Sequence, residues 1–399
     1  MAKTEIENKI LQLATKVLPQ QIKWRRYLHQ YPEVSNKEFE TTKYLSNEIQ
    51  KLSLKINKNK QPTGFTTDII GNKKGPLVAV RTDIDALPIL EQTNLSYQSK
   101  NKGCMHACGH DMHMATILGA ATILKELQNE LSGSVRFLFQ PSEEMPPGGA
   151  IPMIENGVLD GVQMIFGLHV DPHLQTGKIG LRDGISMGSV TDFDLIIHGR
   201  SGHAARPHHT VDAITTAAEV VESLQKIVSR EVDPIDPVVI TFGKISGGYA
   251  RNVICDKVHL VGTIRTLSPK AAKDVPKKVK QITQAICKAR GASMEMIIEG
   301  EYPVLVNDID TNNIIKHNFE SLFGKNKIED TPPVLGGEDF ACYLEHVKGA
   351  MFRLGVMNKK IKADQPWHSP NFIVDEQALY HGTSVIVASI LDAMNKLTK

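Results

Sequence analysis

The order of strand-like and helix-like segments is the feature that most restricts the fold of this chain. In the first half, β-rich runs at 76–85, 134–140 and 162–170 are separated by amphipathic stretches such as 114–131, which has apolar residues at helical spacing. A β-α-β alternation of this kind predicts an α/β fold. Its sheet should be mostly parallel or mixed, with helices on both faces.

The pattern changes after about Gly184. Four strand-like runs now enclose two helical patterns in the order β-α-β-β-α-β, over the ranges 189–200, 211–231, 237–245, 257–267, about 273–290 and 293–302. This order predicts a compact α+β insert of about a hundred residues, a size that a separate small domain can have.

The α/β pattern then resumes with a helix near 309–323, a strand at 349–356 and a C-terminal helix from about 375. A length of 399 residues exceeds the usual size of one hydrophobic core. We therefore expect one domain to be interrupted by another. The expected parts are residues 1–184 and 303–399 for the first domain and residues 185–302 for the inserted domain.

Charge and cysteine content exclude several classes of protein. The formal net charge is only +2, so nothing indicates nucleic acid or an acidic membrane surface as a partner. The N-terminal segment has charges every few residues, and no run of 18 apolar residues occurs, so we expect a cytoplasmic protein. The five cysteines are an odd number and widely scattered, which argues against a disulfide framework.

Side chains that can bind a metal follow several of the expected strands. Ligands of α/β sheets bind at the carboxyl ends of strands, so these side chains should face one edge. The set comprises Asp83, Asp85, Cys108, His110, Glu143, Glu144 and His169. A mixture of imidazole, thiol and carboxylate suits zinc, with manganese, cobalt or nickel as alternatives.

The pair Glu143 and Glu144 adds a chemical argument. A metal hydrolase needs one carboxylate to hold the metal and another to accept a proton from the attacking water and return it to the leaving group. Neighbouring residues on a strand point to opposite faces, but a turn beyond the strand end can bring both into one cavity.

The densest stretch, GCMHACGHDMH at 103–113, does not serve one purpose throughout. Cys108 and His110 are the candidate ligands, whereas Asp111 and His113 are candidates for supporting them. We expect Cys104 to be scaffold, together with His106. A redox role for Cys104 and Cys108 is disfavoured because their spacing of four differs from C-x-x-C.

Several long motifs resemble a known family. They are HQYPEVSNKEFET (29–41), RTDIDALP (81–88), MHACGHDMH (105–113), QPSEE (140–144), GLHV (167–170), SGHAARPH (201–208), GGEDF (336–340) and HSPNF (368–372). In this order they resemble the two-metal aminoacylase and carboxypeptidase family, in its hippurate hydrolase and indole-acetyl-amino-acid hydrolase branch. The resemblance spans almost the whole chain.

The resemblance implies two divalent metal ions per subunit in a catalytic domain, and an inserted lid domain through which a homodimer or homotetramer forms. Transferred position by position, the implied ligands are Cys108, His110, Glu144, His169 and His368. Cys108 would bridge the two metals, a position that an aspartate occupies in other branches. His368 is reached only through the resemblance.

The remaining roles concern catalysis and substrate binding. The resemblance implies Glu143 as general base, His203 of the lid as the residue that stabilises the oxyanion, and Asn252 as a substrate contact. Asp83, at a strand end, suits the support of a metal-bound histidine. Arg251 could bind a substrate carboxylate through its guanidinium group.

Two positions depart from the family pattern, and one further contact is open. His208 is a further candidate substrate contact. Cys255 stands where proline is usual and Gly337 where alanine is common, which leaves the substrate preference open rather than the reaction type.

The expected function is metal-dependent hydrolysis of the amide bond in N-acyl amino acids or short peptide-like molecules. The alternative within the same chemistry is a carboxypeptidase or dipeptidase that acts on short peptides. A metal-bearing binding protein without catalysis, which would have no need of Glu143, and a redox-active thiol protein are the alternatives from other classes.

Overall fold

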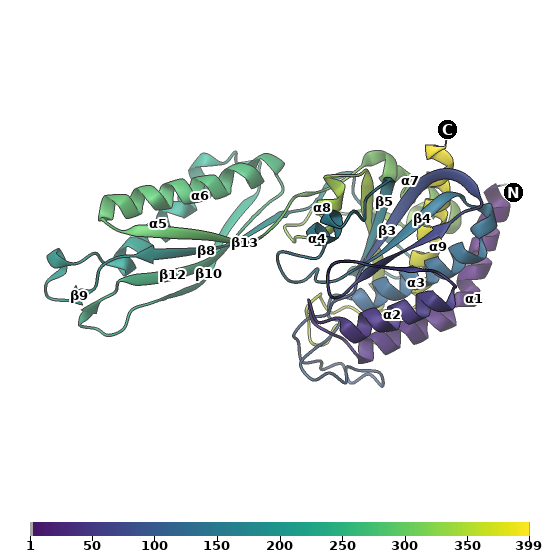
Figure 1. The fold of residues 1–399 in the computed structure, drawn as a ribbon, viewed down its shortest axis with the longest axis horizontal. Coiled ribbons are helices and arrows are strands. Elements are labelled where there is room, and N and C mark those ends of the chain that lie inside the picture. Colours follow the sequence, from purple (N-terminus) through teal and green to yellow (C-terminus); the bar gives the residue numbers. More distant parts are fainter. Residues whose placement is uncertain (1–2, 399) are drawn as a thin grey trace. The chain divides into compact units, whose positions relative to one another are not determined.

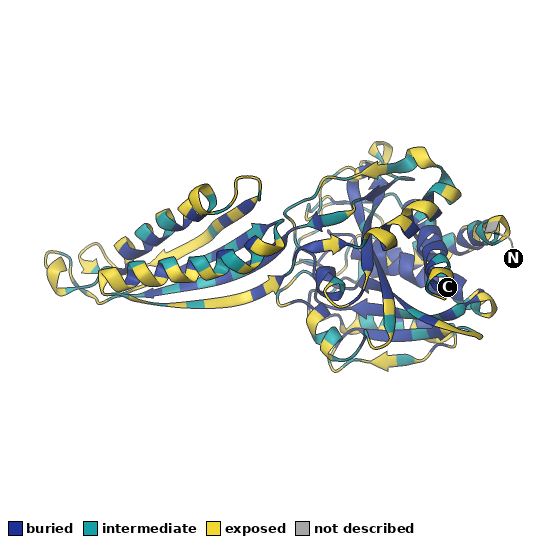
Figure 2. Ribbon diagram, turned by 90° about the horizontal axis from the view of Figure 1, so that it is seen from above, coloured by how far each residue is buried: buried dark blue, intermediate teal, exposed yellow. Residues whose placement is uncertain are grey.

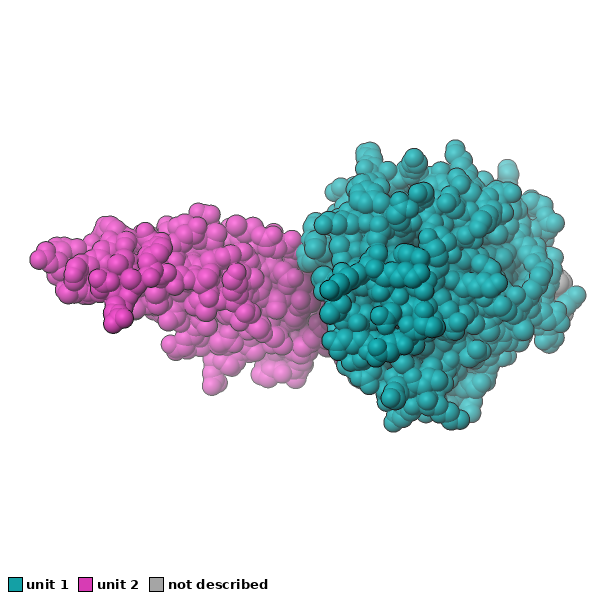
Figure 3. Space-filling view, turned by 90° about the horizontal axis from the view of Figure 1, so that it is seen from below, with its two compact units in different colours: residues 1–184, 306–332, 342–399 teal, residues 185–305, 333–341 magenta. Residues whose placement is uncertain are grey.

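The structure, a computed structural model, describes residues 3–398, and the chain divides into two compact units (Figure 3). The larger unit consists of Met1–Gly184, Val306–Pro332 and Cys342–Lys399, and the smaller unit of Ile185–Leu305 and Pro333–Ala341. The smaller unit is therefore inserted into the sequence of the larger one. Residues 303–305 and 333–341 are grouped with the smaller unit, although the expected boundaries assigned them to the second part of the larger domain.

A mixed sheet forms the centre of the larger unit. Its strands in spatial order are β1 (Ile56–Lys58), β2 (Phe65–Ile70), β4 (Ser132–Gln140), β3 (Lys73–Asp83), β5 (Val162–Gln175), β16 (Gly349–Met357), β6 (Ile179–Leu181) and β15 (Ile328–Asp330). The central neighbours β4, β3, β5 and β16 run parallel. Strand β2 pairs antiparallel with β1 and β4, and β6 pairs antiparallel with β16 but parallel with β15. The expected α/β fold with a mixed sheet is confirmed.

Helices α3 (His110–Glu126) and α9 (Ala378–Leu397) pack against β3, and α1 (Lys3–Gln30) packs on both helices. Nearly every residue of α3 is buried. In Figure 2 buried residues are dark blue, and they fill the interior of the larger unit. A helix that is apolar on all sides must lie between other elements, and α3 lies between the sheet and α1. Further helices of this unit include α2 (Phe39–Lys51), α4 (Ala150–Glu155) and α7 (Ile309–Phe323). In the part of the chain that the structure describes, no helix has the length and apolar character needed to cross a membrane.

The smaller unit contains an antiparallel sheet with two helices on one face (Figure 1). Its strands in spatial order are β10 (Val238–Gly247), β12 (Lys257–Thr266), β8 (Ser189–His198) and β13 (Ser293–Tyr302), and its helices are α5 (Ala213–Lys226) and α6 (Pro269–Arg290). Helix α6 buries Val275, Val279, Thr283 and Cys287, which are four residues apart and therefore line one face. The expected β-α-β-β-α-β order is observed.

The carboxyl ends of the parallel strands prepare a site in the larger unit. Asp83 is the last residue of β3, and its register partner Gln140 is the last residue of β4. The Glu143–Glu144 pair follows directly after β4. Helix α3 begins at His110, four residues earlier than the sequence pattern indicated. The loop that precedes α3 therefore lies close to the carboxyl ends of these strands.

Candidate metal centre

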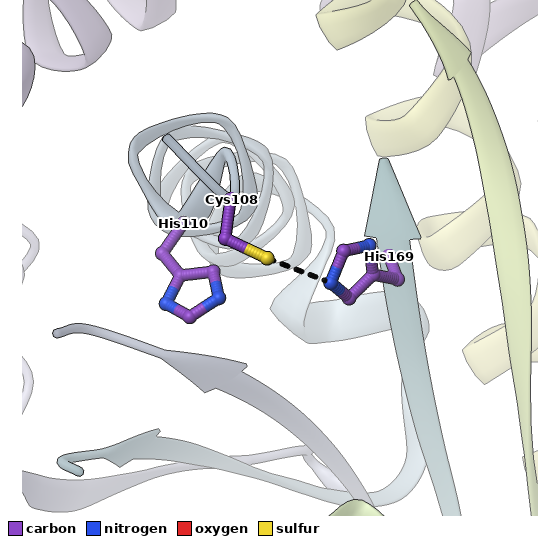
Figure 4. A group of neighbouring side chains, drawn as sticks. All are labelled: Cys108, His110 and His169. Carbon is purple, nitrogen blue, oxygen red and sulfur yellow. Dashed lines mark hydrogen bonds between the residues drawn. The ribbon is translucent and has the colours of Figure 1, made fainter. Parts of the chain in front are cut away.

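Side chains from four places in the larger unit converge on one another. The candidate ligand atoms of Cys108, His110 and His169 all lie within 4.8 Å of one another, and the same holds for Cys108, Glu144 and His368. Figure 4 shows Cys108 and His110 at the start of α3, with the Cys108 side chain pointing toward His169 on β5. The Sγ atom of Cys108 is 3.4 Å from Nε2 of His169. The five positions implied as ligands therefore lie together, and Cys108 belongs to both groups.

Gly109 makes the turn between the first two of these residues possible. Its φ of 89° lies in the left-handed region, where glycine alone is free of steric cost. A Cβ atom at this position would be only 2.4 Å from Cγ2 of Val170. A glycine here thus allows the chain to turn tightly beside β5, with Cys108 before the turn and His110 after it.

Backbone carbonyls fix the tautomers of two histidines. Nδ1 of His110 is 2.9 Å from the carbonyl oxygen of Asp85, and Nδ1 of His169 is 2.8 Å from that of Val170. A carbonyl oxygen only accepts, so each Nδ1 must carry a hydrogen and donate it. Each Nε2 is then the atom that can bind a metal, as in metal sites whose histidines are oriented by a second hydrogen bond.

Two polar atoms at the centre of the site are buried without a hydrogen-bond partner among the described residues. They are Nε2 of His110 and Oε1 of Glu144, 3.8 Å apart. Leaving such atoms unsatisfied costs on the order of 1–3 kcal/mol each. A divalent cation between them would satisfy both, so the residues present fit a metal ion.

The local charge also favours a cation. Burial lowers the pKa of His110, but the carboxylates of Asp83, Asp85 and Glu144 outweigh this effect and raise it to about 10. Burial raises the pKa of the Cys108 thiol well above its usual value, and the nearby glutamates raise it further. The acidic side chains thus hold a proton on His110 that a metal ion can replace.

His113 supports the site and is not free to bind a metal. Its Nε2 accepts the amide hydrogen of Val170 at 2.9 Å, and its Nδ1 lies 2.7 Å from Oδ1 of Asp83. Both ring nitrogens are thus engaged, and the ring is neutral because burial lowers its pKa to about 4. Asp83 is fully buried and also accepts from Arg81 at 2.7 Å. Its position behind two histidines suits an orienting role.

Glu143 lies beside the ligand groups at the beginning of a strained turn. Its carboxylate oxygen is within 4.8 Å of the ligand atoms of His110 and Glu144, and its residue is 8% exposed. The preceding Ser142 has a φ of 54°, which is unusual for a residue with a side chain. A turn after the strand therefore does bring both glutamates to one place.

Glu38 holds this turn and was not recognised from the sequence as a site residue. Its carboxylate accepts from the amide of Ser142, the amide of Asn36 and the hydroxyl of Thr63, each at 2.9 Å. Burial raises the pKa of Glu38 to about 7, with a further contribution from Asp85. The only signal for Glu38 in the sequence was its place in the motif at 29–41.

His368 completes the second group from a distant part of the chain. Its Nε2 is 3.4 Å from Oε1 of Glu144, and its backbone amide donates to the carbonyl of Ala107 at 2.9 Å. Its φ of 62° again lies in the left-handed region. The backbone bond places His368 next to the turn that carries Cys108.

The residues expected to contact substrate lie in the smaller unit, and their roles stay predictions. His203 on β9 (Gly202–His203) pairs with Val253 of β11 (Val253–Ile254), and the amide of Ala204 donates to the carbonyl of Asn252 at 3.1 Å. His203 and Asn252 are therefore neighbours within this unit. Arg251 is exposed, and His208 lies against the ring of His209.

The other residues of the dense stretch behave differently from the ligands. Burial raises the pKa of Cys104 to about 12, which makes its thiol unreactive. Burial lowers the pKa of His106 to about 3, and neither of its ring nitrogens has a hydrogen-bond partner among the described residues. Both side chains fit the scaffold role expected for them.

A buried ion cluster anchors Asp111, the residue after His110. Nε of Arg25 on α1 is 2.7 Å from Oδ2 of Asp111, and Nδ1 of His29 is 2.9 Å from the same oxygen. The side chains of Arg25 and Asp111 are each 1% exposed. Burial raises the pKa of Asp111, but Arg25 and His29 outweigh it and hold this pKa well below its usual value.

We expect Arg25→Met to lower the free energy of unfolding by about 3–5 kcal/mol, because it leaves the carboxylate of Asp111 buried with less compensation. Urea unfolding of the chelator-treated protein, followed by far-UV circular dichroism, measures this loss. Arg26→Met is the matched control. Arg25 and Arg26 both form an ion pair with Glu376, at 3.3 and 2.7 Å, but the side chain of Arg26 is 47% exposed. Arg26→Met should cost less than about 1 kcal/mol.

The same comparison has a defined pH dependence. The folded pKa of Asp111 is lower than its unfolded value of 3.8, so its contribution is complete above that value and is lost as the pH falls through the folded pKa. The difference between wild type and Arg25→Met should therefore shrink in acid. An Arg25→Met variant as stable as Arg26→Met at pH 7 would show that the cluster contributes little.

Comparison with known proteins places the chain among metal-dependent hydrolases. The family model described as peptidase family M20/M25/M40 matches residues 79–392. N-acetyl-L-cysteine deacetylase of Bacillus subtilis (strain 168) is 41% identical, over 89% of this chain and 83% of that protein. Thermostable carboxypeptidase 1 of Saccharolobus solfataricus is 37% identical, over 95% of this chain and 93% of that protein.

A solved structure has the same fold. The Bacillus subtilis YXEP protein, described as a dinuclear metal-binding peptidase of the M20 family, superposes with a TM-score of 0.81. It is 34% identical, and the match covers 96% of this chain and 99% of that one. With the family match, these relatives and a ligand cluster that fits a metal ion, the chain belongs to peptidase family M20/M25/M40 and is a metal-dependent hydrolase.

Proposed function

We propose that this protein hydrolyses the amide bond of N-acyl amino acids with two divalent metal ions, drawn from zinc, manganese, cobalt and nickel. The observation that carries the proposal is the position of Cys108 in two ligand groups at once, beside Nε2 of His110 and Oε1 of Glu144, which are buried without a hydrogen bond among the described residues. The residues that would hold these ions are His110, Glu144, His169 and His368, with Cys108, which belongs to both ligand groups and would be shared by the two ions.

The chain's own residues would divide the work as follows. When bound, the metal ions supply Lewis-acid polarisation of the scissile carbonyl and lower the pKa of a water molecule. Glu143 takes one proton from the attacking water as the new carbon–oxygen bond forms. It then gives that proton to the amide nitrogen as the carbon–nitrogen bond breaks, so no proton is gained or lost by the enzyme.

Residues of the smaller unit are proposed to bind and polarise the substrate. The imidazole of His203 would stabilise negative charge on the carbonyl oxygen, and Asn252 would hold the substrate by hydrogen bonds. The guanidinium group of Arg251 would bind the free carboxylate of the amino acid, and His208 is a further candidate contact. Asp83 would keep the metal-binding histidines oriented.

The nature of the relatives supports N-acyl amino acids as the substrate class. The Bacillus relative is named as a deacetylase of N-acetyl-L-cysteine. The Saccharolobus relative is named as a carboxypeptidase, which keeps hydrolysis of short peptides as the second candidate. Both activities cleave a bond next to an amino acid whose own carboxylate is free.

A panel of small amides tests the proposal. We expect kcat/KM for N-acetyl and N-benzoyl amino acids to exceed kcat/KM for dipeptides with the same C-terminal residue by about tenfold or more. A dipeptide carries a free α-amino group at the position of the acyl group, and a site suited to the acyl group offers this amino group no partner. Chromatographic quantification of the released C-terminal amino acid measures both classes, with the methyl ester of the N-acetyl substrate as the control for carboxylate binding. Faster cleavage of dipeptides would make the protein a peptidase instead.

Two cellular properties belong to the same proposal. All five cysteines are free and buried, which suits the reducing cytoplasm. A homodimer or homotetramer through the smaller unit is supported by its exposed apolar side chains, including Ile235, Ile245 and Tyr249.

A further inference from the structure

Trp367 directly precedes His368 and reaches across to the strand that carries His169. Its indole Nε1 donates a hydrogen bond to the carbonyl oxygen of Val170 at 2.9 Å. Val170 is the residue after His169 on β5. One side chain therefore connects the loop of one proposed ligand with the strand of another.

The carbonyl of Val170 is the same group that orients His169. It accepts from Nδ1 of His169 at 2.8 Å, so both of its lone pairs are used, one by the imidazole and one by the indole. The amide of Val170 donates to Nε2 of His113, which in turn is held by Asp83. Both the carbonyl and the amide of Val170 are thus hydrogen-bonded.

The indole ring also limits the space around the imidazole. Its plane is tilted by 77° to that of His169, with ring centroids 5.9 Å apart, and by 83° to that of His173 at 5.2 Å. Edge-to-face contacts of this kind are favourable and directional. The backbone amide of His368, the next residue, donates a hydrogen bond to the carbonyl of Ala107.

We propose that Trp367 is a positioning residue, which fixes the carbonyl of Val170 and thereby holds His169 in the orientation that presents its Nε2 toward Cys108. This inference rests on the proposed assignment of His169 and His368 as ligands, and it does not depend on the substrate. Loss of the indole N–H frees the carbonyl of Val170 to move and weakens the hold on the imidazole.

The test compares two identical substitutions. The chain has two tryptophans, and the indole of Trp24 also donates at 2.9 Å, to Glu48 on α2 and away from the ligands. Trp367→Phe and Trp24→Phe therefore remove the same indole N–H, which donates to a backbone carbonyl at Trp367 and to a carboxylate at Trp24. Zinc affinity, measured by competition with a chromogenic chelator, should fall about 10-fold or more in Trp367→Phe. In Trp24→Phe it should stay within about twofold of wild type.

A second measurement separates positioning from packing. Nitrogen-15 NMR of the metal-free protein should show the His169 ring hydrogen on Nδ1 in wild type and in Trp24→Phe, and a mixture of tautomers in Trp367→Phe. Equal zinc affinities in the two variants, or an unchanged His169 tautomer, would overturn the proposal. If Trp367→Phe does not fold, 3-benzothienylalanine incorporated into the Trp24→Phe protein replaces the N–H at position 367 by sulfur in a ring of the same shape. The same outcomes then decide.

Discussion

Glu143→Gln is expected to keep its bound metal and to lose about 10²–10⁴-fold in kcat, the range that a positioned general base contributes. The amide of glutamine has nearly the size of the carboxylate but cannot take a proton from water at neutral pH. Because Glu144, and not Glu143, is the proposed ligand of this pair, the metal content should remain near two ions per chain. Turnover of an N-acetyl amino acid and elemental analysis of the same sample measure the two quantities.

The control for this experiment is Glu155→Gln, the same substitution at an exposed residue of α4 in the same unit. It should leave kcat and metal content unchanged. Turnover of Glu143→Gln within about threefold of wild type would remove Glu143 as the base. Loss of metal together with activity would instead make Glu143 a ligand.

Removal of metal by a chelator is expected to abolish hydrolysis, with a loss of about 10³-fold or more, because the Lewis acid supplies several kcal/mol of the transition-state stabilisation. Addition of zinc, manganese, cobalt or nickel to the dialysed protein should restore activity. The order of restored kcat/KM among these ions ranks them as the working metal. The measurement is a titration of activity against metal added per chain, which should saturate at two equivalents.

Magnesium is the control for this titration, because it prefers oxygen ligands and binds imidazole and thiolate poorly. It should restore little activity at the same concentration. Full activity of protein shown to be metal-free would reject the metal mechanism altogether. Saturation at a single equivalent would reject the bridge at Cys108.

Site residues whose positions follow from the order of strands and helices could be found from the sequence. Cys108, His110, Glu144 and His169 each lie at or just beyond the end of an expected strand or at the start of an expected helix. Parallel strands put such ends at one edge, so the convergence followed from the β-α-β pattern. The β-α-β-β-α-β order of the smaller unit could be predicted for a similar reason, since its periodicities are strong.

Residues that depend on long-range packing could not be found in this way. His368 follows a loop without periodicity, and its contact with Glu144 depends on a left-handed backbone conformation that no sequence pattern indicates. The role of Arg25 requires α1 to pack on α3, and that of Glu38 requires the segment before α2 to meet the turn after β4. Gly337 gives a related case, because a Cβ atom there would lie 2.1 Å from Cγ2 of Val190. Only the tertiary structure shows why alanine does not fit.

The position of β16 in the sheet determines when the sheet and the proposed metal site can be completed during synthesis. This strand, residues 349–357, lies between β5 and β6, which are made almost two hundred residues earlier. During translation the sheet therefore cannot be completed between β5 and β6 until the whole smaller unit has been synthesised. The proposed ligand set also remains incomplete until His368 has left the exit tunnel. With these ligands, metal would be bound only after most of the chain has been synthesised, and the thiol of Cys108 would have to stay reduced until then.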